Sequence, residues 1–187
     1  MCFPKPGTQV IGIGRSLSKN EAVPNLLVSV SGLRFDNAVA AIIVVDDGRY
    51  LMQLRDDKPG IFYPGHWGLF GGAVEPGEEP VEALKRELIE ELEFSPKNIR
   101  YFTRMDFDFD PFGAGHCYRM FFEVPIGSGD LTRLRLGEGC CMEPIPIERL
   151  LLDEHLVPYD SFALWLHYQA RKNGIETLKI PKKREEQ

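Results

Sequence analysis

The sequence predicts one α/β (α+β) domain with a central mixed β-sheet. Short apolar and β-branched runs, typical of strands, recur along the chain, and segments with helical periodicity lie between and after them. The chain has 187 residues, and its 43% apolar content is sufficient for a sizeable core. We expect residues 24–175 to form this domain, residues 1–23 an irregular extension and residues 176–187 a C-terminal tail.

Strands are predicted where apolar runs are bounded by turn residues. The run NAVAAIIVV ends at Asp46-Asp47-Gly48, a hairpin signal, so RYLMQL at residues 49–54 is expected to pair back onto it. Residues 55–65 contain two Pro-Gly breaks and are expected to form a loop. Within the N-terminal extension, VIGIG is a candidate strand. Further strands are expected at residues 66–72, 99–109, 116–124 and, leading into a short helix, 144–152.

Two longer helices are predicted. Pro80 suits the first turn of one helix, where its missing N–H costs nothing. Apolar residues then recur at three- and four-residue spacing, at Val81, Leu84, Leu88 and Leu92. The second helix is expected at residues 161–173, with Asp160 or Ser161 as its N-terminal cap and Gly174 as its end.

Glutamates crowd the end of the first predicted helix, in the run RELIEELEF. At about 100° per residue, Glu87, Glu90 and Glu91 share one flank of this helix, next to its leucine face. Like charges at such spacings repel by roughly 0.2–0.5 kcal/mol per pair, so a cation should compensate them. Arg86 is able to serve one carboxylate, and a divalent cation such as Mg²⁺, which prefers oxygen ligands, would serve the others.

The loop before this helix supports a metal site over the alternative of a solvated acidic face. Gly71-Gly72 allows the backbone to approach a ligand closely and offers unhindered carbonyl groups. Pro76-Gly77 forms a turn that brings Glu75 and Glu78 back toward the helix. The chemistry implied is metal-assisted attack of water on a phosphate.

These residues carry a family resemblance. The run from Gly72 to Phe94 resembles the Nudix box of the Nudix hydrolases, which reads glycine, five residues, glutamate, seven residues, then Arg-Glu-aliphatic-x-Glu-Glu-x-Gly-aliphatic. Phe94 matches loosely, and Glu93 departs from the pattern, which expects glycine. The resemblance implies a Nudix-like α/β/α sandwich. The matching positions are Gly72, Glu78, Arg86, Glu87, Leu88, Glu90 and Glu91.

The resemblance also implies a metal site for Mg²⁺ or Mn²⁺. Glu90 and Glu91 would be the main metal ligands, and Glu87 would be a further ligand or the general base. The carbonyl group of Gly71 or Gly72 would add a ligand.

The catalytic set implied by the resemblance is Glu87, Arg86 and Glu90, with Arg86 orienting Glu87. Glu78 would hold the loop to the helix through an ion pair. An acid outside the box often completes such a site, and we nominate Glu138, with Glu143 as the second choice.

Aromatic residues near the glycine turn are candidates for substrate binding. Trp67 is able to stack on a base, although a core role is equally compatible with the sequence. Phe62 and Tyr63 lie in the preceding loop, where lining the substrate pocket and simple packing remain alternatives.

A second acidic motif does not match a known site. Its carboxylates begin like a calcium loop, but the sixth position is Pro111 and the twelfth is Cys117. Alternation with phenylalanines predicts a strand with one buried face, and His116, at the end of the following loop, is interpreted as structural. The carboxylates of this motif are Asp106, Asp108 and Asp110.

Composition narrows the cellular context. The net charge of −6 argues against a nucleic-acid partner, because binding to its backbone needs a basic surface. No apolar run approaches the ~18 residues of a membrane span, and the first residues lack the pattern of a signal peptide. None of the four cysteines forms a C-x-x-C pair, so a cytoplasmic location is expected.

The functional prediction is a Mg²⁺-dependent pyrophosphohydrolase. Its substrate would be a nucleoside diphosphate derivative, of the nucleotide-sugar or ADP-ribose type, or a nucleoside triphosphate. The alternative is a non-catalytic Nudix-like module that senses a nucleotide, although the intact set of carboxylates favours the enzyme. Many family members dimerise, so a homodimer is compatible with the resemblance, but the sequence does not require one.

The end of the acidic helix poses a separate problem. A glycine at the position of Glu93 would adopt the left-handed conformation cheaply, whereas a non-glycine residue loses roughly 1–2 kcal/mol there. Pro96 nevertheless requires the helix to stop nearby. We expect Glu93 to accept a strained cap, or the helix to end by another route, without disturbing Glu87, Glu90 and Glu91.

Overall fold

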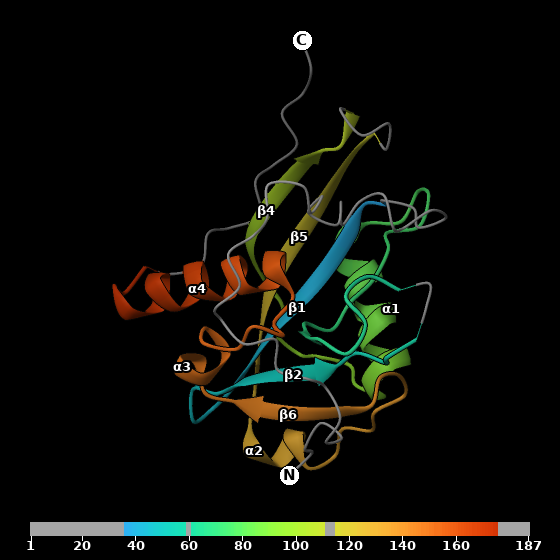
Figure 1. Cartoon of the computed structure of the whole chain (residues 1–187). Coiled ribbons are helices and arrows are strands. Elements are labelled where there is room, and N and C mark those ends of the chain that lie inside the picture. Colours follow the sequence, from blue (N-terminus) through green and yellow to red (C-terminus); the bar gives the residue numbers. More distant parts are fainter. Residues whose placement is uncertain (1–35, 59–60, 111–114, 176–187) are drawn as a thin grey trace, which may run out of the picture.

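The computed structural model describes residues 36–58, 61–110 and 115–175, and these form a six-stranded mixed sheet with helices on both faces (Figure 1). The sheet order is β3-β2-β1-β5-β4, and β6 pairs with β2 off this path. The strands are β1 (Ala38–Val45), β2 (Tyr50–Leu54), β3 (Trp67–Gly68), β4 (Arg100–Asp108), β5 (His116–Ile126) and β6 (Cys141–Ile145).

The mixed character of the sheet arises at its centre. β1 runs parallel to β5, with Ala38 opposite Arg119, and antiparallel to β2. The hairpin between β1 and β2 turns at Gly48, which has a φ of +88° and donates its N–H to the Val45 carbonyl. β4 and β5 form a second antiparallel pair. The predicted hairpin and mixed sheet are both confirmed.

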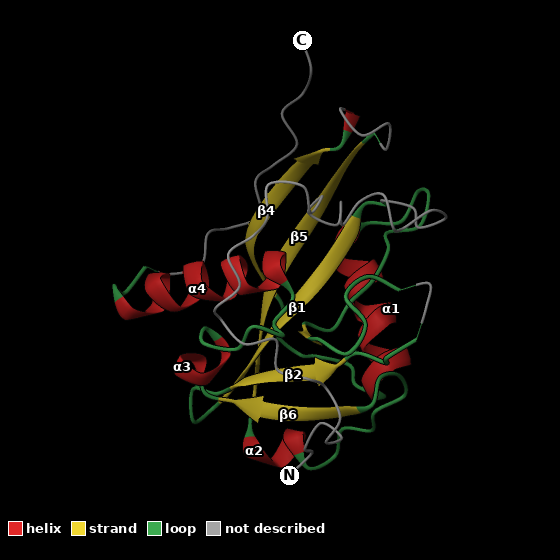
Figure 2. Ribbon diagram, in the orientation of Figure 1, coloured by secondary structure: helices red, strands yellow, loops and turns green. Residues whose placement is uncertain are grey.

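Helices cover both faces of the sheet and give the expected three layers (Figure 2). The helix α1 packs on one face, while α3 and α4 pack on the other. The four-residue α2 was not predicted, since so short a segment shows no periodicity. The helices are α1 (Pro80–Leu92), α2 (Ser128–Leu131), α3 (Ile147–Leu150) and α4 (Pro158–Lys172).

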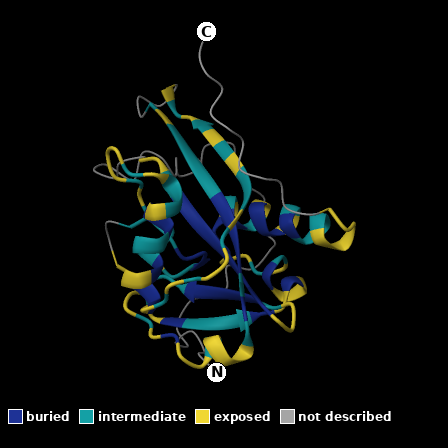
Figure 3. Ribbon diagram, turned by 180° about the vertical axis from the view of Figure 1, so that it is seen from behind, coloured by how far each residue is buried: buried dark blue, intermediate teal, exposed yellow. Residues whose placement is uncertain are grey.

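Strand β1 divides the interior into two cores because successive side chains point to opposite faces. One set of alternate residues packs toward α1, in a cluster that also contains Leu84 and Leu88. The other set packs toward α3 and α4, in a cluster that contains Ala163 and Leu164. A continuous apolar run such as AVAAIIVV is therefore buried on both sides, as the dark band through Figure 3 shows.

The predicted start of α1 is confirmed, and its end is strained. Glu93 adopts the left-handed conformation, with φ 51° and ψ 36°. Its N–H donates to the Ile89 carbonyl, and the Phe94 N–H donates to the Leu88 carbonyl at 3.1 Å. Of the two routes expected, the helix therefore takes the strained cap.

The final helix begins earlier than predicted. α4 starts at Pro158, with Val157 before it, and neither Asp160 nor Ser161 is its cap. Asp160 is 2% exposed and its Oδ2 accepts the Leu69 N–H at 2.9 Å. Its carboxylate therefore binds the backbone just after β3 instead of capping α4. The helix ends before Gly174, which has a φ of +65°, as expected.

A buried polar chain connects α4 to the sheet. His167 Nδ1 lies 2.9 Å from the Tyr50 hydroxyl, and its Nε2 lies 2.9 Å from Glu123 Oε2. Glu123 Oε1 also accepts a hydrogen bond from Arg100 at 3.1 Å. Burial lowers the pKa of His167, so its neutral ring donates to Glu123 and accepts from Tyr50.

Some expectations fall outside the described residues. These are the extension at residues 1–23 with its candidate strand VIGIG, the apolar run that follows Pro24, and the tail at residues 176–187. Within the described ranges, no helix is sufficiently long and apolar to cross a bilayer.

Candidate active site

The glycine turn before α1 lies directly against β1. The Val39 N–H donates to the Gly72 carbonyl and the Ala41 N–H donates to the Phe70 carbonyl, both at 2.9 Å. Gly71 has a φ of +129°, and a Cβ atom there would overlap the Val39 carbonyl. The sequence predicted that Gly71-Gly72 allows a close approach to a ligand. In the structure this turn approaches the backbone of β1 closely.

Glu87 packs against the second glycine of this turn. A Cβ atom at Gly72 would lie 2.5 Å from the Glu87 carboxylate, so only glycine leaves room for that side chain. Burial raises the pKa of Glu87, although the ion pair with Arg86 opposes this shift. The turn and the helix thus meet at a partly desolvated carboxylate.

Arg86 is the centre of the charged network. Its Nε and Nη2 donate to the two carboxylate oxygens of Glu78, at 3.0 and 3.1 Å. Its Nη1 lies 2.8 Å from Glu87 Oε1 and 3.4 Å from Glu90 Oε2, and its Nη2 also donates to the Ala73 carbonyl. One guanidinium therefore joins the loop to the helix and restrains Glu87.

Glu91 turns inward beneath the glycine turn. Its Oε2 accepts the Gly71 N–H at 2.7 Å, and its Oε1 accepts a hydrogen bond from Gln53 Nε2 at 3.2 Å. The residue is only 6% exposed. Burial, together with smaller contributions from the nearby charges of Glu87 and Glu138, raises the pKa of Glu91 to about 7.

Gln53 is the site residue that the sequence analysis missed. Its Nε2 donates both to Glu91 and to the Leu69 carbonyl, at 3.2 and 3.1 Å, and the side chain is buried. The available signal was a polar amide within the apolar strand run YLMQL. A buried amide needs partners, and here one partner is a metal-ligand candidate.

The three flank glutamates occupy different environments. Glu87 and Glu90 meet at Arg86, whereas Glu91 lies beneath the turn. The Glu90 side chain is 57% exposed and that of Glu87 only 16%. The ligand atoms of these three glutamates do not all lie within 4.8 Å of one another. Among the described residues, a group of His, Cys, Asp or Glu side chains that meets this distance lies elsewhere in the chain.

Glu138 lies close enough to this set to act on it electrostatically. The segment before it runs along the end of α1, where the Gly137 N–H donates to the Glu91 carbonyl at 2.7 Å. The charge of Glu138 contributes to the raised pKa of both Glu87 and Glu91. Glu143, the second nominee, instead forms an ion pair with Arg149 at 2.9 Å.

The donor set fits a hard divalent cation. Glu91 is buried with two acids nearby and accepts hydrogen bonds from two neutral donors, an amide side chain and a backbone N–H. A cation bound by the carboxylate of Glu91 would stabilise the charged form of this side chain. Carboxylates and a backbone carbonyl are the ligands that Mg²⁺ and Mn²⁺ prefer.

The aromatic candidates take different positions. Trp67 is 7% exposed and belongs to the core beneath α4, which is the packing alternative that the sequence left open. Tyr63, with φ 49°, places its ring edge-on to those of His66 and Tyr159. The Phe62 carbonyl accepts a hydrogen bond from Arg55 Nε at 2.9 Å.

Comparison with known proteins identifies the family of this arrangement. The family profile described as NUDIX domain matches residues 34–165. A stretch of 50 residues is 52% identical to the nucleoside triphosphatase NudI of Escherichia coli O1:K1 / APEC. That stretch is 27% of this chain, and it spans only 35% of the length of the relative.

Solved structures share the fold. A MutT protein from Methanosarcina mazei Go1 superposes with a TM-score of 0.60 at 21% identity, covering 76% of this chain and 97% of that one. The NUDIX domain of Shewanella oneidensis NrtR, solved as a complex with ADP ribose, gives 0.56 at 18% identity, covering 76% and 91%.

Proposed function

The chain belongs to the NUDIX family, and from this premise we propose that it is a pyrophosphohydrolase dependent on Mg²⁺ or Mn²⁺. It would cleave a phosphoric anhydride bond in a nucleoside triphosphate or in a nucleoside diphosphate derivative. The observation that carries the proposal is the network of Arg86, which joins Glu78, Glu87 and Glu90 beside the buried Glu91.

The proposed roles follow from these contacts. Glu90, Glu91 and Glu87 would hold the cation, which when bound neutralises phosphate oxygens and makes water a better nucleophile. The Gly72 carbonyl already accepts the Val39 N–H, so the Gly71 carbonyl is the preferred backbone ligand.

The other residues of the network would position this set. Arg86 keeps the carboxylate of Glu87 pointed at the glycine turn, and Glu78 fixes Arg86 through two hydrogen bonds. Glu138 would contribute the acid from outside the box, since its charge acts on Glu87 and Glu91. Each of these roles can be tested by a substitution that removes the charge of the side chain and keeps its size.

A nucleoside triphosphate is the preferred substrate class. Its support is the activity for which the NudI relative is named, and that relative matches this chain over 50 residues. An ADP-ribose type substrate is supported by the ligand of the NrtR domain, whose likeness to this chain is one of fold alone. A cytoplasmic setting fits both classes, and within the described part of the chain Cys117 and Cys140 form no disulfide.

The proposal is tested with a panel of nucleoside triphosphates, nucleotide sugars and ADP-ribose, with phosphate and pyrophosphate detection in the presence and absence of Mg²⁺. Glu90→Gln should reduce turnover at least about 100-fold, because it removes a proposed ligand of the cation. The variant should still fold, because the Glu90 side chain is exposed. Glu82→Gln is the matched control, because Glu82 lies on the same helix but pairs with Lys85. Wild-type rates for Glu90→Gln would exclude the assigned metal set.

The alternative of a nucleotide-sensing module predicts a different outcome of the same panel. Isothermal titration with ADP-ribose would then show tight binding in Mg²⁺, and no member of the panel would be hydrolysed. The intact carboxylate set favours the enzyme, because a sensor does not need a network that restrains Glu87 through Arg86.

A further inference from the structure

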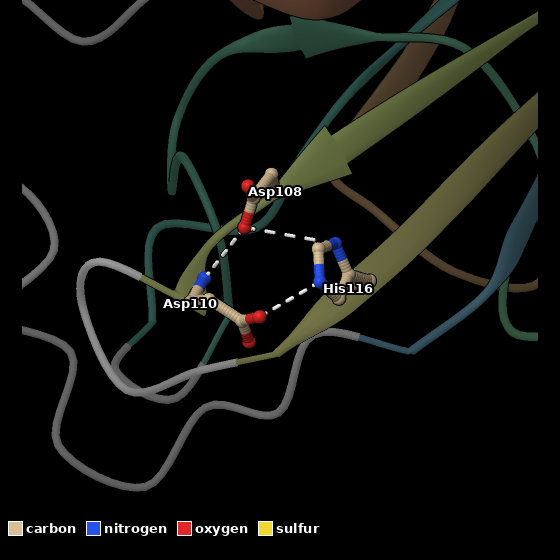
Figure 4. A group of neighbouring side chains, drawn as sticks. All are labelled: Asp108, Asp110 and His116. Carbon is tan, nitrogen blue, oxygen red and sulfur yellow. Dashed lines mark hydrogen bonds and ion pairs between the residues drawn. The ribbon is translucent and has the colours of Figure 1, made fainter.

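A second group of metal-ligating side chains lies at the end of the β4–β5 hairpin (Figure 4). Asp108, the last residue of β4, is directly opposite His116, the first residue of β5. Asp110 follows β4 and returns its carboxylate toward the same imidazole. The sequence had singled out Asp108, Asp110 and His116 separately, and antiparallel pairing brings them together.

The three side chains lie close together, with the two carboxylates next to different nitrogens of the imidazole ring. His116 Nε2 lies 2.7 Å from Asp110 Oδ2, and its Nδ1 lies 3.6 Å from Asp108 Oδ1. One ligand atom from each residue lies within 4.8 Å of the other two. The Asp110 N–H donates to Asp108 Oδ1 at 2.9 Å, which holds the Asp108 carboxylate against the backbone of Asp110.

The charge of this group calls for a cation. Two carboxylates lie next to one imidazole ring at the strand ends. Arg104, four residue pairs along the same strand, is bound to Asp106 and lies over the Tyr118 ring at 4.2 Å. A bound metal ion would compensate the two carboxylates.

The surrounding surface has room for an ion and its remaining ligands. A cavity of about 210 Å³ is lined by residues of both strands, including Asp108, His116 and Cys117. The side chains of Asp108, Asp110 and His116 are each about 60% exposed or more, so an ion is able to enter from solvent. Water would complete the coordination shell.

This group is separate from the candidate active site. It lies on β4, the last strand of the sheet order, and on its neighbour β5. The glycine turn of the active site lies against the other side of β1, next to α1. Figure 1 shows the end of the β4–β5 hairpin extending beyond the body of the domain, away from α1.

We propose that Asp108, Asp110 and His116 form a second metal site, which binds a transition-metal dication with Zn²⁺ as the preferred ion. Zn²⁺ is bound by imidazole nitrogen and by carboxylate oxygen, whereas Ca²⁺ takes about six to eight oxygen ligands. Around a tetrahedral Zn²⁺ neighbouring ligands are about 3.4 Å apart, so Asp110 need move from His116 by less than about 1 Å.

The consequence of binding is a cross-link between two strands. Asp108 and Asp110 follow each other at the end of β4, and His116 begins β5, so a bound ion would join the strand ends. The joined ends belong to the longest strand pair of the sheet, β4 and β5. The site therefore acts on the stability of the hairpin, independently of hydrolysis at the box.

The test is titration of the metal-free full chain with Zn²⁺ in excess Mg²⁺, by isothermal titration calorimetry with elemental analysis after desalting. Mg²⁺ keeps the active-site carboxylates occupied, and we expect about one Zn²⁺ per chain at the second site. His116→Ala should abolish this binding, and Asp108→Asn should weaken it at least about 10-fold. Both side chains are exposed, so the variants should fold, which circular dichroism verifies.

His155→Ala is the matched control. His155 is also exposed and lies 3.6 Å from one aspartate, Asp153, but it has no second carboxylate in its ion pair. This variant should bind Zn²⁺ like the wild type. Equal Zn²⁺ binding by wild type and His116→Ala, or none by the wild type, would overturn the proposal.

Discussion

Glu93→Gly removes the strain at the end of α1 and should stabilise the protein. In the structure Glu93 is one of two non-glycine residues with positive φ among those described, and it closes the helix in the left-handed conformation. It is exposed, and its backbone N–H keeps its bond to the Ile89 carbonyl whatever the side chain. The substitution therefore changes conformational strain and charge, with little loss of packing.

The expected gain follows from three contributions. Relief of the left-handed strain is worth roughly 1–2 kcal/mol, and removal of an acid from the helix C-terminus roughly 0.3–1 kcal/mol. The greater freedom of glycine in the unfolded chain opposes these by roughly 0.5–1 kcal/mol. We expect Glu93→Gly to raise the free energy of unfolding by about 1 kcal/mol, which corresponds to about 2–4 °C in Tm.

Urea unfolding followed by fluorescence and circular dichroism measures this change. Glu93→Ala separates the contributions, because it removes the charge but keeps a Cβ atom in the left-handed region, and it should gain less than half as much. A decrease in stability for Glu93→Gly, or equal gains for both variants, would refute the assignment of strain to this cap.

Three further substitutions test the site and the core. Gly71→Ala should destabilise the protein by about 2–4 kcal/mol in thermal unfolding, because the new Cβ would overlap the Val39 carbonyl at positive φ. Arg86→Lys should lower kcat at least about 10-fold with the fold intact by circular dichroism, because lysine cannot hold Glu78 through two bonds. Burial lowers the pKa of His167. Below pH ~6.5 the unfolded chain therefore binds a proton at this residue that the folded chain does not bind, so the free energy of unfolding decreases as the pH falls. His167→Gln should flatten this loss in urea unfolding measured between about pH 7.5 and 5.

Local patterns predicted the elements on which the site is built. The β1–β2 hairpin and the start of α1 were predictable because turn residues, Pro80 and apolar periodicity each act within a few residues. An ion pair of Glu78 that holds the loop to the helix was expected from the family resemblance, and the structure forms one between Glu78 and Arg86 at 3.0 Å. The metal and catalytic roles themselves remain predictions for the variants to decide.

Contacts between distant segments were not predictable in the same way. Gln53 reaches Glu91 across 38 positions, and Asp160 reaches Leu69 across 91. Nothing in the neighbouring sequence distinguishes Asp160 from a helix cap, since aspartate near a helix start is the usual signal for one. Its burial arises from the packing of α4 on the sheet, which only the fold determines.

The carboxylate of Glu91 is held by contacts that do not involve the strained end of α1. Glu91 is held from the sheet side, by the Gly71 N–H and by Gln53, and its position therefore does not depend on how the helix ends two residues later. Its own carbonyl accepts the Gly137 N–H, so the segment leading to Glu138 covers that helix end. A glycine cap is dispensable here because tertiary contacts fix the last turn of the helix.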